Sequence, residues 1–211
     1  MCDVTCEHIP ECQQCGLYKY SSCPCIIGKG TLNKNTNLFL IGEAPGPDES
    51  KRGEVFIGRA GKMLDKMIKP FTKDLTIYIT NAVKCYPPVS TRFPEKGFRV
   101  PKISEIELCR RFLLEELSLA PNVVLLMPLG NTALTTILLD KHEGITKAIG
   151  KFRQITMGNG ITYTVLPNYH PSYVLRNNNH RPEFERVMGL AVKYTHGELN
   201  CLTYLQENNK Q

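Results

Sequence analysis

The chain has 211 residues, a mass of 23.8 kDa and a formal net charge of +6, with 42% hydrophobic and 22% charged residues. This length fits one compact domain with its own core, and the composition excludes a disordered or fibrous protein. No stretch approaches the roughly 18 apolar residues of a membrane span, and the start lacks a signal-peptide pattern. We therefore expect a soluble, intracellular monomer with one domain over residues 1–211, a cysteine-rich segment 1–30 and a polar tail 198–211.

Short apolar runs and amphipathic stretches alternate along the chain. Runs rich in β-branched and aromatic residues predict strands over 37–41, 76–80 and 122–127, and a glycine turn predicts a hairpin that joins 152–156 to 161–166. Apolar periodicity and capping patterns predict helices over 60–71, 104–119, 130–139 and 182–196. The second of these helices has a capping box formed by Ser104 and Glu107. The alternation predicts an α/β protein, a three-layer α/β/α sandwich with a central, mainly parallel four-stranded sheet.

The nine cysteines are the unusual feature of the composition. Six of them lie in the first 25 residues, and a chain without a secretion signal is expected in a reducing compartment, where disulfides are disfavoured. An odd number of cysteines cannot pair completely. Ligation of a metal or an iron-sulfur cluster is therefore the interpretation to test.

Three loops that follow predicted strands carry the polar residues of interest. Ligands of parallel sheets bind beyond the carboxyl ends of the strands, which makes these loops the expected site. They are Gly42-Glu43-Ala44-Pro45-Gly46, Thr80-Asn81-Ala82-Val83-Lys84-Cys85 and His170-Pro171-Ser172-Tyr173-Val174-Leu175-Arg176. Together with Phe56-Ile57-Gly58-Arg59-Ala60-Gly61, they resemble the family 4 uracil-DNA glycosylases, the iron-sulfur branch of the uracil-DNA glycosylase superfamily. The resemblance runs from about residue 12 to residue 176 and preserves the order and approximate spacing of the motifs.

The resemblance implies an enzyme of base excision repair that acts on uracil in single- or double-stranded DNA. It would hydrolyse the N-glycosidic bond and release free uracil, leaving an abasic site. It also implies a structural 4Fe-4S cluster on Cys12, Cys15, Cys85 and Cys109, whose soft thiolates suit iron. Zinc on the same four cysteines is an alternative, and so is Cys6 or His8 as a ligand. Cys2, Cys6, Cys23, Cys25 and Cys201 have no place in the family pattern.

Two carboxylates are candidates for activating water. Family 1 enzymes carry a catalytic Asp at the position that this chain fills with Ala44, so the task must fall to another residue. Glu43 is the first candidate and Glu49 the second, although either could be a plain surface carboxylate or turn former. The small residues Gly42 and Ala44 would let the backbone approach a flipped base.

Three further residues match the family's contacts to the base. Phe56 matches the aromatic that stacks on the extruded uracil. Asn81 presents a donor beside an acceptor, which suits the O4 and N3–H of uracil and mismatches cytosine. His170 is expected near O2, where it would stabilise the charge on the leaving base as either a neutral or a protonated ring. Without the motifs, Phe56 would be an ordinary core residue and Asn81 a turn residue.

The remaining family contacts are to DNA. Ser172 and Arg176 are expected to contact the backbone, and Leu175 or Val174 to fill the gap that the extruded nucleotide leaves. The basic loop before Ile103 is longer than in the family and could track phosphates. Two alternatives remain: a non-catalytic, replication-associated DNA-binding module, and a glycosylase for hypoxanthine or a 5-substituted uracil.

Overall fold

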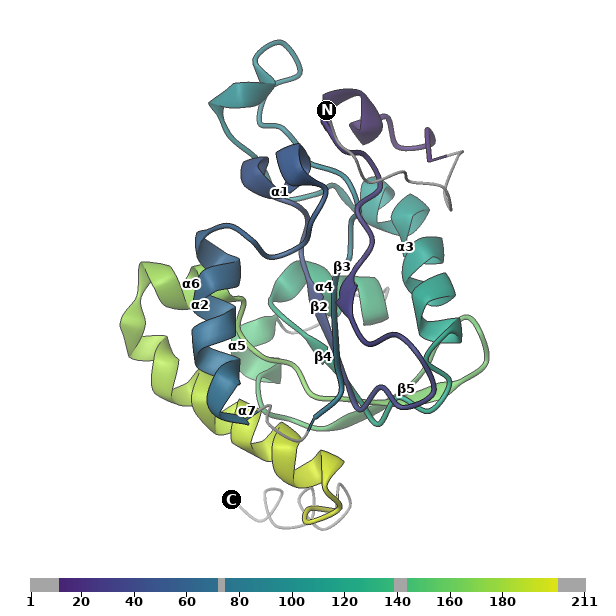
Figure 1. Ribbon diagram of the computed structural model, residues 1–211, viewed down its shortest axis with the longest axis vertical. Coiled ribbons are helices and arrows are strands. Elements are labelled where there is room, and N and C mark those ends of the chain that lie inside the picture. The colour runs from purple at the N-terminus through teal and green to yellow at the C-terminus, as the bar shows by residue number, and fades with distance from the viewer. Residues whose placement is uncertain (1–11, 72–74, 139–143, 201–211) are drawn as a thin grey trace.

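Figure 1 shows the computed structural model, which describes residues 12–71, 75–138 and 144–200. A six-stranded sheet runs through its middle in the order β1-β3-β2-β4-β6-β5. The strands are β1 Lys29–Gly30, β2 Leu38–Gly42, β3 Ile77–Asn81, β4 Leu125–Pro128, β5 Arg153–Thr156 and β6 Thr162–Val165.

The centre of the sheet is parallel and its two edges are antiparallel. β3, β2, β4 and β6 run in one direction, whereas β1 and β5 run opposite to their neighbours. The mainly parallel sheet is therefore confirmed, but the predicted number of four strands is wrong. β1 has only two residues, too few to leave a periodic pattern, and β5 is the first strand of the predicted hairpin, which joins the same sheet.

Helices cover both faces of the sheet, which confirms the three layers (Figure 1). Along β2, Leu38 and Leu40 pack in one core with side chains of α2 and α7, while Phe39 and Ile41 pack in a second core with α3 and α4. This alternation follows from the period of two along a strand. The α-helices are α1 Pro47–Arg52, α2 Arg59–Ile68, α3 Ile103–Ser118, α4 Asn131–Leu138, α5 Ile145–Ala148, α6 Pro171–Arg176 and α7 Arg181–Thr195. Short 3-10 helices are η1 Leu17–Tyr20, η2 Lys69–Phe71, η3 Pro94–Lys96 and η4 Asn178–His180.

The four predicted helices match α2, α3, α4 and α7, but one predicted cap is wrong. Helix α3 begins at Ile103, and it is the carboxylate of Glu105, not that of Glu107, that accepts the Lys102 backbone N–H at 2.8 Å. The unpredicted helices α1, α5 and α6 have four to six residues, too few for a clear apolar period. Among the described residues no helix combines the length and apolarity that crossing a bilayer requires.

The loops beyond the carboxyl ends of the parallel strands are joined by backbone hydrogen bonds. Ala82 N–H donates to the Gly42 carbonyl at 2.9 Å, and Val83 N–H donates to the Glu43 carbonyl at 3.0 Å. On the other side of β2, Gly130 N–H donates to the Asn168 carbonyl at 2.9 Å. Backbone hydrogen bonds thus hold the predicted site loops against one another at the carboxyl ends of the parallel strands.

Candidate active site

A cavity of about 360 Å³ opens at this edge, within the size range of small-molecule sites. All but one of the residues predicted to act in catalysis, base contact or DNA contact line it. They are Glu43, Ala44, Glu49, Phe56, Asn81, His170, Ser172, Leu175 and Arg176. The exception, Gly42, lies directly behind the wall. Val174, the alternative to Leu175, is fully buried in the core.

Gly42 sets how closely Phe56 and Asn81 approach each other. A Cβ on Gly42 would lie 2.4 Å from the Phe56 ring and 2.5 Å from Asn81 Oδ1, so no side chain fits. Asn81 is 2% exposed, and its amide makes no hydrogen bond within the described ranges. Asn81 lines the cavity, so its amide offers a donor and an acceptor side by side to a ligand that supplies an acceptor and a donor.

Phe56 is held in a backbone conformation that side chains rarely adopt. Its φ is 54°, in the left-handed region. Its carbonyl accepts from Lys29 Nζ at 3.3 Å, and its backbone packs so closely on Gly61 that a Cβ there would lie 2.1 Å from the Phe56 carbonyl carbon. Strain of this kind persists only where the surroundings enforce it, and it gathers at functional sites.

Glu49 holds the loop that carries Phe56 in place through hydrogen bonds. It lies in the first turn of α1 and is 8% exposed. Its Oε1 accepts the backbone N–H groups of Ile57 at 3.0 Å and Gly58 at 2.8 Å, directly before α2. Hydrogen bonds from two backbone N–H groups occupy this oxygen. The contacts of Glu49 are therefore those of a positioning residue.

Glu43 is oriented differently. Its Oε2 accepts from the hydroxyl of Thr132 at 2.5 Å, and this bond is the side-chain contact found for it in the described residues. Thr132 lies in the first turn of α4 and is 5% exposed. The bond fixes the plane of the carboxylate at the cavity wall and leaves its other oxygen for a water molecule. Nothing in the local sequence marks Thr132, because its partner is 89 residues away.

His170 caps helix α6 with its own ring. Nδ1 accepts the Ser172 backbone N–H at 3.2 Å and lies 2.7 Å from the Ser172 hydroxyl. Burial, with a smaller contribution from the positive charge of Arg176, lowers the pKa of His170 to about 4. The ring is therefore neutral at neutral pH, and with Nδ1 as acceptor its proton lies on Nε2. The cap thus favours a neutral ring with its proton on Nε2, and the ring centroid lies 6.1 Å from that of Phe56.

The four predicted cysteine ligands come together beside the cavity. Cys12, Cys15, Cys85 and Cys109 belong to one cluster, which also contains Cys25 and contacts Ala44 of the cavity wall. Cys25 was not predicted as a member of this set. In the described residues no three His, Cys, Asp or Glu side chains already have the spacing of a ligand set for one metal ion. Cys2, Cys6, His8 and Cys201 lie outside the described residues.

Backbone N–H groups point at two of these sulfurs. Cys25 N–H donates to Cys85 Sγ and Lys84 N–H donates to Cys109 Sγ, both at 3.2 Å. Such bonds stabilise thiolate sulfur and tune the iron-sulfur clusters that thiolates hold. Burial raises the pKa of Cys109 to about 12, so a nearby cation is needed to keep its sulfur deprotonated. The cluster thus has the donor type of a metal centre, and its sulfurs would have to move to ligand spacing for one to bind.

Comparison with known proteins decides the family. The sequence model of the uracil DNA glycosylase superfamily matches residues 29–189. This chain belongs to that superfamily. The type-4 uracil-DNA glycosylase of Thermotoga maritima is 32% identical over 192 residues, covering 88% of each chain. The type-4 enzyme of Archaeoglobus fulgidus is 33% identical over 184 residues, covering 85% of each. A DNA polymerase of Bacillus phage SP01 is 27% identical over 184 residues, 18% of its length.

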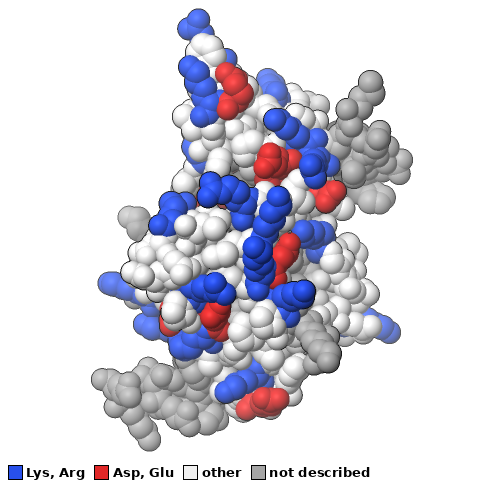
Figure 2. All heavy atoms as spheres, turned by 60° about the vertical axis from the view of Figure 1, so that its left-hand side comes forward, with Lys and Arg blue, Asp and Glu red and all other residues white. Residues whose placement is uncertain are grey.

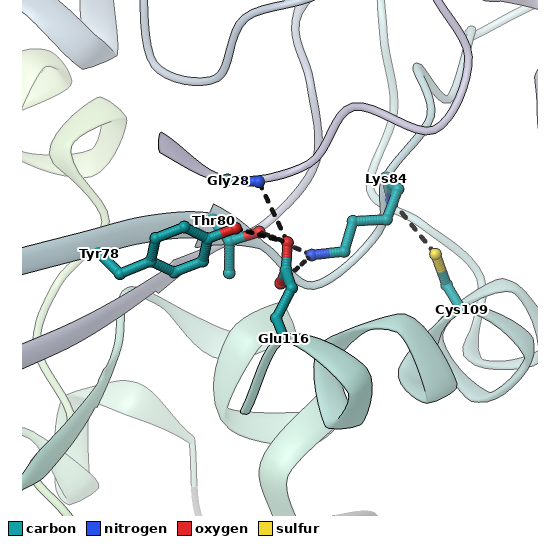
Figure 3. Close-up of polar contacts among 6 residues, drawn as sticks. All are labelled: Gly28, Tyr78, Thr80, Lys84, Cys109 and Glu116. Atoms are coloured by element: carbon teal, nitrogen blue, oxygen red, sulfur yellow. Dashed lines mark hydrogen bonds and ion pairs between the residues drawn. The ribbon is translucent and has the colours of Figure 1, made fainter. Parts of the chain in front are cut away.

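In this member of the superfamily, Lys84 and Glu116 form a buried ion pair close to Cys109 (Figure 3). Lys84 is fully buried, and its Nζ donates to Glu116 Oε2 and to Thr80 Oγ1, both at 2.6 Å. Glu116 Oε1 accepts from the Tyr78 hydroxyl, the Thr80 hydroxyl and the Gly28 N–H, each at 3.0 Å. The network ties α3 to β3 directly behind the loop that holds Asn81.

Removing the ammonium from this network should be strongly destabilising. Lys84→Met leaves the carboxylate of Glu116 charged in the interior, and breaking a buried pair in this way costs about 3–5 kcal/mol. Urea unfolding checks the loss, and adding Glu116→Gln should restore a substantial part of it. The matched control is Arg181→Met, which breaks the exposed pair with Glu185 and should cost less than about 0.5 kcal/mol. Equal losses for the buried and exposed pairs would contradict the expectation.

The lowered pKa of His170 predicts a dependence of stability on pH. The unfolded chain binds a proton at this histidine near its ordinary pKa of 6.5, whereas the folded chain does so only near pH 4. The stability from the neutral ring is therefore complete above pH 6.5 and is lost as the pH falls towards 4. Between about pH 7 and pH 5, the wild type should lose more free energy of unfolding than His170→Asn, as measured by urea unfolding. Parallel curves for the two proteins would show that the ring keeps its ordinary pKa.

Proposed function

We propose that this chain is a monofunctional uracil-DNA glycosylase that releases free uracil from DNA and leaves an abasic site. The observation that carries the proposal is one cavity, in a member of this superfamily, that gathers an aromatic ring, an amide, a neutral histidine and an oriented carboxylate. These side chains are Phe56, Asn81, His170 and Glu43. The type-4 relatives carry the same activity in their names.

Each of these side chains has one step in the proposed reaction. Phe56 stacks on the extruded base, and the amide of Asn81 pairs with its O4 and N3–H. Glu43 orients a water molecule towards C1′ of the sugar and balances the positive charge that develops there. As the bond from C1′ to N1 breaks, His170 Nε2–H donates to O2 of the leaving base. The water oxygen forms a bond to C1′, and the proton that the water loses neutralises the uracil anion.

The proposed DNA contacts come from both ends of helix α6. Leu175 is 39% exposed at the mouth of the cavity and is the wedge for the space that the nucleotide leaves. Arg176 and Ser172 contact the phosphates on either side. The Ser172 hydroxyl also bonds to the ring of His170, so the residue that contacts the strand also orients the donor to the base.

The proposed cofactor is a 4Fe-4S cluster on Cys12, Cys15, Cys85 and Cys109. When bound, it supplies a cross-link between the N-terminal segment, the loop after β3 and helix α3. Iron and acid-labile sulfide in the purified protein, with a broad visible absorbance, would support this assignment. Zinc in stoichiometric amount without iron would replace it by a four-cysteine zinc site.

A single experiment tests the activity. Oligonucleotides with one uracil, thymine, hypoxanthine or 5-hydroxymethyluracil are incubated with the enzyme as single strands and as duplexes, and free base is measured by chromatography. Release of uracil, with strand cleavage only after alkali, is expected. No release despite tight binding would favour a replication-associated binding module, the role suggested by the phage polymerase relative. Faster release of another base would make that base the substrate.

A further inference from the structure

The segment 86–102 forms a projection beside the cavity, drawn in teal at the top of Figure 1. It is built as a hairpin: Pro88 pairs with Phe98 in an antiparallel bridge, and Val89 N–H donates to the Gly97 carbonyl at 2.9 Å. Arg99 N–H donates to the Pro87 carbonyl, also at 2.9 Å. The projection therefore has a defined backbone.

Side chains fix the projection to the body of the protein. The guanidinium of Arg99 donates to both carboxylate oxygens of Glu105 in α3, at 2.8 and 2.7 Å. The hydroxyl of Tyr86 donates to the Pro94 carbonyl at 2.9 Å, which ties the tip of the projection to the start of the segment. A site on such a support loses little conformational freedom when a ligand binds.

One aromatic ring of the projection faces the cavity. Phe98 is 51% exposed and yet lines the cavity wall, together with Ala44 and Leu175. A large exposed aromatic at the mouth of a ligand site is a feature of binding surfaces. The sequence did not single out Phe98, because only the hairpin pairing brings it from the basic loop to the cavity.

The tip of the projection holds two cations in place. Lys96 Nζ lies 4.2 Å and Arg92 Cζ 5.2 Å from the centroid of the Phe93 ring, so both are cation–π partners of one side chain. Figure 2 shows Lys and Arg side chains at the tip of this projection and across the face below it, where acidic side chains also lie among them. The charge pattern suits a polyanion that runs from the tip to the cavity.

We propose that the projection 86–102 is a second DNA-binding site, which takes an unpaired nucleotide next to the extruded uracil. Phe98 stacks on the base of that nucleotide, and Arg92 and Lys96 contact its neighbouring phosphates. This combination of an aromatic platform with a basic track is how proteins bind single strands without reading their sequence. The inference rests on the proposed function, since the strand that reaches Phe98 is the one whose uracil enters the cavity.

The site favours single-stranded DNA over a duplex. In a duplex, the neighbours of a flipped nucleotide keep their stacking and pairing partners, so Phe98 gains little from them. In a single strand these bases are free, and stacking on an aromatic ring replaces contact with water. The effect of removing the ring is therefore larger on single strands.

Binding to DNA without uracil tests the stacking separately from excision. Fluorescence anisotropy is measured with a labelled thymidine oligonucleotide, both as a single strand and as a duplex with its complement. On the single strand, Phe98→Ala should bind about 10-fold more weakly or worse, Phe98→Leu similarly weakly, and Phe98→Tyr close to wild type, with a smaller loss on the duplex. Val100→Ala, at a residue 64% exposed on the same segment but outside the cavity, is the matched control and should bind like wild type. Circular dichroism confirms that each variant is folded.

Three outcomes would overturn the proposal: Phe98→Ala binding as tightly as Val100→Ala, Phe98→Leu binding like wild type, or equal losses on single strands and duplexes. Failure of the wild type to release uracil, with the binding pattern intact, would instead contradict the proposed function alone.

The salt dependence of DNA binding tests the contribution of Arg92 and Lys96 separately. On single strands the slope of log affinity against log salt is about 0.7 for each phosphate contact, so Arg92→Gln with Lys96→Gln should make it shallower by about 1.4. An unchanged slope would remove these two residues from the site.

Discussion

Asn81→Asp is expected to lose at least about 100-fold in the rate of uracil excision, with a gain in activity on cytosine relative to uracil. Residue 81 is 2% exposed and its side-chain oxygen packs against Gly42, so an aspartate of the same shape would occupy the same place at the cavity. Its carboxylate oxygens accept but do not donate, so the match to uracil O4 is lost, while the amino group of cytosine gains an acceptor. Single-turnover rates on oligonucleotides with uracil or cytosine measure both effects.

Two controls separate selectivity from folding in this test. Urea unfolding should show Asn81→Asp less stable than the wild type, because a carboxylate at this 2% exposed position loses most of its hydration, so the rates are compared at a temperature where both proteins are folded. Thymine excision measures whether the cavity has merely loosened. A variant that keeps the wild-type ratio of uracil to cytosine rates would show that Asn81 does not read the base.

The sequence predicted that these residues come together because a parallel sheet leaves little freedom in where its loops go. β2 and β3 are neighbours in register, with Gly42 opposite Asn81, so residues that end both strands must meet. The same logic brought His170 to the edge through β6. Short apolar runs were sufficient for this, since burial on both faces requires them.

The missed features all depend on contacts between distant segments. Thr132 and Glu43 are 89 residues apart, and Cys25 reaches Cys85 across 60 residues. The contacts of Glu49 are hydrogen bonds from two backbone N–H groups, which no sequence motif indicates. Phe98 reaches the cavity because the loop that contains it folds as a hairpin. Local patterns specify elements and their ends, but side-chain contacts between loops are set by the three-dimensional packing.

The two carboxylates at the cavity are expected to respond differently to the same change. Glu43→Gln keeps the shape and the bond from Thr132 but removes the charge that orients water and balances the sugar, so kcat should fall by about 100- to 10,000-fold. Glu49→Gln keeps a carbonyl oxygen for the amides of Ile57 and Gly58 and should lose less than about 10-fold. Single-turnover rates with saturating enzyme measure both. A larger loss for Glu49→Gln would exchange the two roles.

The hydroxyl that orients Glu43 gives an independent check. Thr132→Val keeps the size of the side chain but removes the donor, so the carboxylate plane is no longer fixed and the rate should fall by about 10-fold, one net hydrogen bond. Thr136→Val is the matched control: its hydroxyl donates to the Thr132 carbonyl inside the same helix and does not line the cavity. If Glu43 activates water, Thr132→Val slows excision, whereas Thr136→Val affects only stability. Equal rates for the two variants would mean that the orientation of this carboxylate does not limit the reaction.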